Sequence, residues 1–238
     1  MDQELSGLSS MATRLILADL SDHIRRDHGI SVRFESAGGV EVARRVREGT
    51  EADVIVLADD ALAELEREGH LRAGSMRPLW ISQVVAAVPA GLRVPALRSE
   101  SDLRTVLLAA ERVAYSTGPS GTALVDLITG LDLAETLRTR LVQAPPGVPV
   151  GSLLASGEAD LAFQQHSELM DLPGVVIIGP LPGNTAISST FSAGVLAAST
   201  QPSRAFEVLD ILGSDAASKT AGARGMRAAR ADPGCLGQ

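Results

Sequence analysis

The sequence predicts an α/β protein built on a parallel sheet. Short apolar runs alternate with segments whose apolar residues recur at helical spacing, and both halves of the chain show this alternation. Glycine and serine mark most junctions between the two kinds of segment. The 238 residues correspond to one or two small domains, long enough to bury a core without a disulfide or a metal.

The first half opens with a short strand over residues 5–9 and a helix that Ser10 caps. The apolar positions of this helix follow helical spacing, and Gly29 marks its end: Ile16, Leu17, Leu20 and Ile24. Alternation over 30–34 predicts a second strand. The other segments are a turn at 36–39, a helix ending at Gly49, a strand at 53–57, a helix at 61–68 closed by Gly69, and strands at 83–88 and 112–115.

The second half repeats the pattern. A loop over 115–121 joins a strand to a helix over 122–131. The next segments are a strand at 142–144, a Pro/Gly loop at 145–151, a helix at 152–156, a strand at 160–163, a short helix at 166–170 and a strand at 175–178. A long strand over 191–198 and helices over 203–212 and 216–221 close the fold, and we expect a flexible tail from Arg224.

Composition excludes several classes of function. The net charge is −8 without a polybasic run, and aromatic residues make up 3% of the chain, so we expect no nucleic-acid partner. The one cysteine, Cys235, has no disulfide partner, and the four histidines lack metal-ligand spacing: His23, His28, His70 and His166. Without a Walker A, GxGxxG or GxSxG pattern, we expect no metal, no cofactor and no hydrolase serine.

The N-terminus has acidic residues where a signal peptide has a basic region, and no window reaches the ~20 apolar residues of a membrane span. We therefore expect a soluble, cytoplasmic chain without membrane insertion, or a periplasmic or secreted one if a leader has been removed. The sequence does not indicate an oligomeric state.

Four strand-to-helix junctions are rich in serine, glycine and threonine: Ser9–Ser10, Gly38–Gly39, 116–121 and 147–152. Glycine lets a backbone approach a ligand, and the first amides of a helix have no internal partner. In parallel sheets such loops gather at the carboxyl ends of the strands, so the four junctions predict a site for a small anion. The alternative is that they are ordinary turns with capping residues.

The titratable candidates are few. Glu168 would serve as a base if its surroundings raised its pKa, and otherwise as a helix-capping group. His166 lies beside it, with a surface or capping role as the alternative. Arg44, Arg45 and Arg47 form a run of which at most one can face a site, the others being solvated.

Several segments resemble the type II bacterial solute-binding proteins, the molybdate-binding group in particular: 36–40, Gly49, 52–54, 157–160 and 165–168. The resemblance covers about residues 5–226 and implies two Rossmann-like α/β lobes joined by two crossover strands with a cleft between. It implies one lobe over 1–83 plus 194–223, a second over 84–193, and a tail over 224–238. Gly39 stands where that group has an oxyanion-binding serine and Gln165 where it has a ligand tyrosine, while Ser10 is retained. Two lost hydroxyl donors disfavour molybdate.

Longer runs are similar to bacterial aconitate isomerases, enzymes on the same scaffold: 9–14, 115–121, 142–151, 163–165, 167–169 and 179–182. This resemblance implies a cofactor-independent 1,3-allylic proton shift on a small di- or tricarboxylate, most simply between cis- and trans-aconitate. It implies Glu168 as the first candidate for the base, His166 as the second, and Ser10 beside them in the catalytic set. Thr13, Arg14 or Arg45 would neutralise a further charge.

The implied contacts with an anionic carboxylate fall into two groups. Those of the first lobe are Ser9, Ser10, Met11, Thr13, Gly38, Gly39, Val40, Arg45 and Ala58. Those of the second lobe are Tyr115, Ser116, Thr117, Gly118, Ser120, Gly147, Val148, Pro149, Val150, Gln164 and Gln165.

The alternative function is a non-catalytic solute-binding protein for a small organic or oxo-anion, since the scaffold supports both. The absence of a visible leader favours the enzyme, because a transporter's receptor works outside the cytoplasm. A ketosteroid isomerase would need an aromatic-lined cleft, and Trp80, Tyr115 and four phenylalanines are too few to line one.

Overall fold

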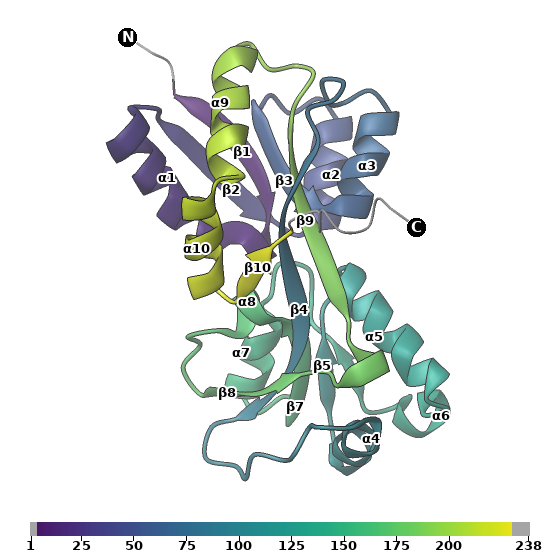
Figure 1. The fold of residues 1–238 in the computed structure, drawn as a ribbon. Coiled ribbons are helices and arrows are strands. Elements are labelled where there is room, and N and C mark those ends of the chain that lie inside the picture. The colour runs from purple at the N-terminus through teal and green to yellow at the C-terminus, as the bar shows by residue number, and fades with distance from the viewer. Residues whose placement is uncertain (1–3, 230–238) are drawn as a thin grey trace, which may run out of the picture. The chain divides into compact units, whose positions relative to one another are not determined.

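A computed structural model describes residues 4–229 (Figure 1). The chain divides into two compact units. Unit 1 comprises the residues up to Ile81 together with those from Thr190 onward, and unit 2 comprises Ser82–Ser189. The divisions thus fall after residues 81 and 189, whereas the sequence predicts them after residues 83 and 193. Strands β4 (Arg77–Pro89) and β9 (Ser188–Val195) contribute residues to both units.

The sheet of unit 1 has the strand order β2-β1-β3-β9. β1 (Leu5–Ser10) pairs in parallel with β2 (Val32–Ala37) and β3 (Val54–Ala58), and β9 is antiparallel to β3. β3 is buried along nearly its whole length, as its unbroken apolar sequence predicts for a strand covered on both faces. The carboxyl ends of β1, β2 and β3 therefore meet at one edge.

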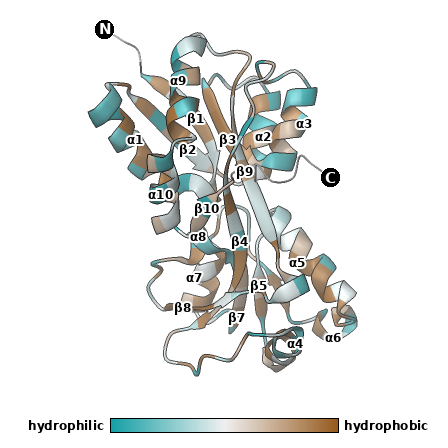
Figure 2. Cartoon of the chain, viewed as in Figure 1, coloured by the Kyte–Doolittle hydropathy of each residue, from teal (hydrophilic) through white to brown (hydrophobic). Residues whose placement is uncertain are grey.

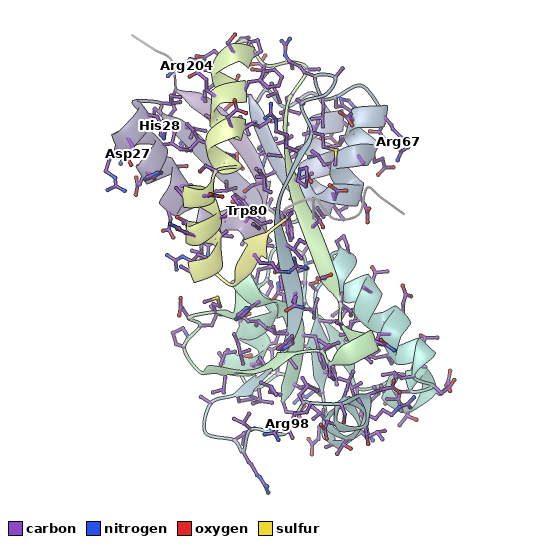
Figure 3. The ribbon with its side chains drawn as sticks, viewed as in Figure 1. Asp27, His28, Arg67, Trp80, Arg98 and Arg204 are labelled. Atoms are coloured by element: carbon purple, nitrogen blue, oxygen red, sulfur yellow. The ribbon has the colours of Figure 1, made fainter. Side chains whose placement is uncertain are left out.

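Helices cover both faces of this sheet. α1 (Arg14–His28), preceded by the 3₁₀ turn η1 (Met11–Thr13), shares one core with α9 (Pro202–Leu212) and α10 (Asp215–Ala223). α2 (Gly39–Arg47) and α3 (Asp59–Arg67) pack on the other face. Trp80, labelled in Figure 3, is fully buried in the first of these cores. Figure 2 shows β3 mainly in hydrophobic colour, β9 largely pale, and parts of α1 and α3 in hydrophilic colour.

The sheet of unit 2 has the order β4-β7-β5-β6. Its strands besides β4 are β5 (Val113–Tyr115), β6 (Leu141–Gln143), β7 (Leu161–Gln165) and β8 (Val175–Pro180). β5 pairs in parallel with β6 and β7, whereas β4 is antiparallel to β7 and β8. The carboxyl ends of β5, β6 and β7 therefore share one edge, as in unit 1.

The two faces of this sheet carry different helices. The core on one face includes residues of α4 (Glu100–Ala109), α5 (Pro119–Gly130) and α6 (Ala134–Leu137). The core on the other face includes residues of α7 (Val150–Ala155) and α8 (His166–Leu169). We call these the α5 face and the α7 face. A 3₁₀ turn, η2 (Gly183–Thr185), precedes β9.

Several elements differ from the sequence-based expectations. The strand expected at 83–88 extends over Arg77–Pro89. α4 was not expected, although Ser99 and Asp102 form a capping box in which the Ser99 hydroxyl accepts from the Asp102 amide at 3.1 Å. α5 begins at Pro119, before the expected 122, because proline is tolerated at the first helical position and its fixed φ favours it there. α7 begins at Val150, before the expected 152, with Pro149 as its N-cap.

The expectation of a flexible tail from Arg224 is wrong for the residues that the structure describes. β10 (Met226–Ala228) pairs with β4, and the amide of Ala229 donates to the carbonyl of Leu79 at 2.9 Å. The side chain of Met226 is 3% exposed within the core of unit 1, which holds the segment in place. Residues 230–238, Cys235 among them, lie outside the described residues.

The histidines of α1 have structural neighbours. His23 Nδ1 lies 2.9 Å from the Asp27 carboxylate, and the rings of His23 and His28 contact each other edge to face. Across residues 4–229, no helix has the length and apolar character needed to cross a bilayer.

The close packing of α5 against the loop before it can be tested at Gly121. A Cβ at this position would lie 1.9 Å from the Ser116 carbonyl oxygen, whereas a Cβ at Gly130, in the same helix, would meet no atom within 4 Å. We expect Gly121→Ala to destabilise the protein by at least about 2 kcal/mol through overpacking. Gly130→Ala, the matched control, should change stability by less than about 1 kcal/mol. Thermal melting measures both, and equal melting temperatures would contradict the close approach of helix and loop.

Candidate functional site

The carboxyl edge of unit 1 brings together residues from three segments of the sequence. Ser10 and Ala37 are register partners at the ends of β1 and β2, and Ser9 is paired with both Ser36 and Val56. Ala58 ends β3 and immediately precedes α3. The structure therefore places the Ser9–Ser10, Gly38–Gly39 and Ala58 junctions at one edge.

The hydroxyls at this edge are not equally available. The Ser9 side chain is fully buried, with its Oγ 2.7 Å from Ser36 Oγ, and Thr13 Oγ1 donates to the Ser10 carbonyl at 3.0 Å. Ser10 is half-buried and caps η1, its Oγ accepting from the Ala12 amide at 3.3 Å. Because that bond uses the oxygen as acceptor, the Ser10 hydroxyl hydrogen remains able to donate to an anion.

The start of α2 offers backbone donors. Gly38 is its N-cap and no side chain caps it, so the amides of Gly39 and Val40 have no intrahelical acceptor. Val40 is 70% exposed, which leaves the helix opening accessible. Met11, between the first junction and α1, is half-buried.

Arg45 does not lie at this edge of the sheet. Its guanidinium donates to both carboxylate oxygens of Glu35, at 2.7 and 3.0 Å, and these bonds lower the pKa of Glu35 below its usual range. Arg45 is six residues along α2, about 9 Å from the helix start, and it lines a separate hollow of about 400 Å³ with Ser6, Arg33, Thr50 and Glu51. It is therefore not placed to neutralise an anion at the Gly38–Gly39 junction.

Arg14 and Asp59 begin two of the helices that follow this edge. Arg14, the first residue of α1, is exposed and forms no ion pair with another of the residues 4–229. Asp59, the first residue of α3, accepts a short hydrogen bond from the hydroxyl of the fully buried Ser192. Asp59 was not predicted from the sequence, although an acidic pair directly follows the apolar run 54–58. A carboxylate there stabilises the helix N-terminus.

The carboxyl edge of unit 2 carries the loop that opens α5. Ser116 Oγ and Ser120 Oγ lie 3.1 Å apart, Gly118 caps the helix, and Thr117 is exposed. Tyr115 ends β5 opposite Phe163 of β7 and is half-buried. The serine hydroxyls and the uncapped helix start form a set of donors suited to an anion.

The loop that opens α7 is different. Gly147, Val148 and Pro149 are exposed, and Gly147 has a φ of +79° that favours glycine. Val150 is fully buried, and its amide donates to Gln164 Oε1 at 3.1 Å. The Val150 amide is thus already used within the protein and does not serve as a free donor.

Gln164 connects this loop to the candidate base. Its Nε2 donates to Glu168 Oε1 at 2.7 Å while its Oε1 accepts from Val150. Gln164 is 4% exposed, so both ends of the amide are satisfied in a buried position. The result is a half-buried Glu168 carboxylate held next to the opening of α7.

Gln165 points to the opposite face of the sheet, because side chains alternate along a strand. Its Nε2 donates to Ser189 Oγ at 2.9 Å, and its buried Oε1 has no hydrogen-bond partner among the described residues. The buried hydroxyls of Ser82 and Ser167 likewise have none within that range. His166, half-buried, follows at the start of α8. Sequence reasoning singled out Gln165 but missed Ser82 and Ser189, which the strand pairing brings next to it.

Each unit carries its own set of hydroxyl and amide donors, and unit 2 adds one well-held carboxylate. Unit 1 offers Ser10 and the start of α2, and unit 2 offers the Ser116–Ser120 loop and the Glu168 carboxylate. Within residues 4–229, no group of three or more His, Cys, Asp or Glu residues is placed to hold a metal ion. Such donors can bind carboxylate or oxo-anions, and a carboxylate can move a proton.

The sequence of this chain is similar to those of known proteins. A sequence profile described as bacterial extracellular solute-binding protein matches residues 5–227. An aconitate isomerase from Pseudomonas sp is 30% identical over 195 residues, covering 81% of this chain and 73% of that protein.

Solved structures share the fold. The periplasmic molybdate-binding protein of Azotobacter vinelandii has a TM-score of 0.79 at 22% identity, covering 94% of this chain and 98% of that one. The sulfate-binding protein SubI of Mycobacterium tuberculosis H37Rv has a TM-score of 0.78 at 17% identity, covering 98% and 88%. At these identities the likeness concerns the fold.

Gln164→Met tests the role of the Gln164 amide. Removing both of its hydrogen bonds leaves the buried Val150 N–H without an acceptor, so we expect a loss of about 1–3 kcal/mol. Hydrogen exchange at the Val150 amide should also become faster. Gln143→Met, at an exposed position on β6, is the control and should leave both quantities unchanged. An unchanged hydrogen-exchange rate of the Val150 amide in Gln164→Met would contradict the hydrogen bond between Val150 and Gln164.

Proposed function

The chain belongs to the bacterial extracellular solute-binding proteins, and from that membership we propose that it binds a small di- or tricarboxylate and interconverts cis- and trans-aconitate. The observation that carries the enzymatic part is the 30% identity to an aconitate isomerase over 81% of this chain. The fold supports binding, and this relative is what favours chemistry on the bound molecule.

The proposed reaction is a 1,3-allylic proton shift that needs no co-reactant. A base removes a proton from the methylene carbon next to a carboxylate, and the electron pair spreads over the allyl system and that carboxylate. The proton then returns to the other terminal carbon, so that the double bond changes position and no atom is gained or lost. Such a step needs one proton-transferring group and donors for the developing negative charge.

Glu168 is the proposed base. Its carboxylate is half-buried and oriented by Gln164 at 2.7 Å, and the same Gln164 side chain accepts from the Val150 amide at the start of α7. Orientation by a second residue is what a proton-transferring group requires, because the transfer depends on hydrogen-bonding geometry. His166, two residues earlier on the same short helix, is the second candidate for this role.

The proposed carboxylate donors are uncharged. In unit 2, which also carries Glu168, they are the hydroxyls of Ser116 and Ser120. Unit 1 offers the same chemistry at its own edge, with the Ser10 hydroxyl and the first amides of α2. Arg14 is the cation proposed to offset further negative charge, and Arg45 is excluded by its pairing with Glu35.

Glu168→Gln is the direct test of the base. Glutamine keeps an oxygen that accepts from Gln164 Nε2 but cannot take up a proton at neutral pH, so the fold should be retained. We expect turnover of cis- or trans-aconitate to fall by about 10²-fold or more. Proton NMR in deuterated water measures interconversion and deuterium uptake at the allylic carbons.

Glu135→Gln is the control for this experiment, because the Glu135 side chain is 92% exposed on α6 of the same unit. Its turnover should equal that of the unmodified protein. Undiminished turnover in Glu168→Gln would reject Glu168 as the base, and the same measurement on His166→Gln would then test the second candidate.

The second candidate function is binding without turnover, which the family membership itself favours. The same NMR experiment separates the two. Saturable line broadening or thermal stabilisation by aconitate, without deuterium uptake, would identify a binding protein. Deuterium uptake at the allylic carbons would identify an isomerase.

A further inference from the structure

We propose that Ser82 and Ser189, together with Gln165, form an uncharged subsite on the α5 face of unit 2 that binds one carboxylate group of the ligand. This inference deepens the proposed function and rests on its carboxylate ligand. Neither serine belongs to a strand-to-helix junction, and the subsite arises from strand pairing alone.

Strand pairing places the three side chains together. Gln165 of β7 is the register partner of Val84 of β4, so the two side chains share the α5 face. The Val84 amide donates to the Ile187 carbonyl at 2.9 Å, which puts the segment leading to Ser189 on the other side of β4. The Gln165–Ser189 bond of 2.9 Å therefore spans β4. Ser82 precedes Val84 by two residues and projects from the same face.

Two polar atoms of this cluster are buried without a partner. Ser82 is 0% exposed and Gln165 is 4% exposed, and neither Ser82 Oγ nor Gln165 Oε1 has a hydrogen-bond partner among residues 4–229. Leaving such an atom unpaired is unfavourable, and folded proteins rarely do so. Ser75, another fully buried serine, shows the usual arrangement: its Oγ accepts from the Val195 amide at 3.1 Å.

The Ser189 hydroxyl allows the Gln165 amide to adopt either of two orientations. A serine hydroxyl can accept from Nε2, as observed, or donate to Oε1 after the amide has turned over. In the second orientation Nε2 becomes the free group. Nε2–H and the Ser82 hydroxyl then provide two donors, which match the two acceptor oxygens of a carboxylate. In a buried position these hydrogen bonds replace the water that the carboxylate loses.

The same cluster accounts for a preference among anions. It contains no cation and two available donors on one face of a sheet, which suits a planar carboxylate. A tetrahedral oxo-anion needs donors from several directions to satisfy its four oxygens. We therefore assign to Ser82, Gln165 and Ser189 a role in selecting carboxylates over oxo-anions.

Ser82→Ala gives opposite results for a ligand-binding and a structural serine. Because it removes an unpaired buried hydroxyl, we expect the melting temperature without ligand to stay the same or rise. The dissociation constant for trans-aconitate, measured by calorimetry, should rise about tenfold or more. Ser75→Ala is the matched control: the same change at a paired serine should lower the melting temperature and leave the dissociation constant unchanged.

Ser189→Ala is the second variant, because it frees the Gln165 amide from its orienting partner. We expect weaker trans-aconitate binding in Ser189→Ala and unchanged binding in Ser188→Ala, at the exposed neighbouring position. Molybdate serves as the second probe. Ser82→Ala and Ser189→Ala should reduce the preference of the protein for trans-aconitate over molybdate.

Three outcomes separate this subsite from the proposed function. If Ser82→Ala and Ser189→Ala both turn over aconitate and bind trans-aconitate with full affinity, the subsite proposal is wrong and the isomerase proposal stands. Binding that both variants weaken, without deuterium uptake by the unmodified protein, supports the subsite and overturns the isomerase. An unmodified protein that binds neither aconitate isomer overturns both.

Discussion

Parallel strand pairing is the constraint on which the candidate site depends. β1 pairs with β2 and β3, and β5 with β6 and β7, so the strands of each group end at one edge and release their loops there. Residues distant in sequence thereby come to lie side by side, as the register partners Ser10 and Ala37 do in unit 1. The donors at each edge include the first amides of helices that no side chain caps, such as α2 and α5.

The neighbouring glutamines at the end of β7 show how one strand can serve two purposes. Gln164 faces the α7 side, where both ends of its amide are hydrogen-bonded and it holds Glu168 in place. Gln165 faces the α5 side, where one end is bonded to Ser189 and the other has no partner among residues 4–229. The first residue is part of the framework, and the second is the one that we propose to contact the ligand. Alternation along a strand produces this division at no cost in sequence length.

Sequence patterns predicted the features that depend on local chemistry. The α/β class, the helix from Ser10 to Gly29 and the grouping of glycine- and serine-rich junctions follow from apolar spacing and capping. Features set by distant partners could not be predicted in this way. Arg45 is committed to Glu35, Val150 to Gln164, and Ser82 is brought to Gln165 by β4, and none of these pairings leaves a periodic signal. α4 is a different case, because its capping box was visible in the sequence and was not used.

The division of the chain also sets the order in which its parts can form. Unit 2 is one uninterrupted stretch, Ser82–Ser189, whereas unit 1 needs residues from both sides of it. During synthesis from the N-terminus, every residue of unit 2 is available before α9, α10 and β10 have been made. The N-terminal part of unit 1 must therefore wait with the apolar surfaces of α1 and of Trp80 incompletely covered. For this chain the second unit in the sequence is the first that can complete its core, a reversal of the usual N-terminal-first order.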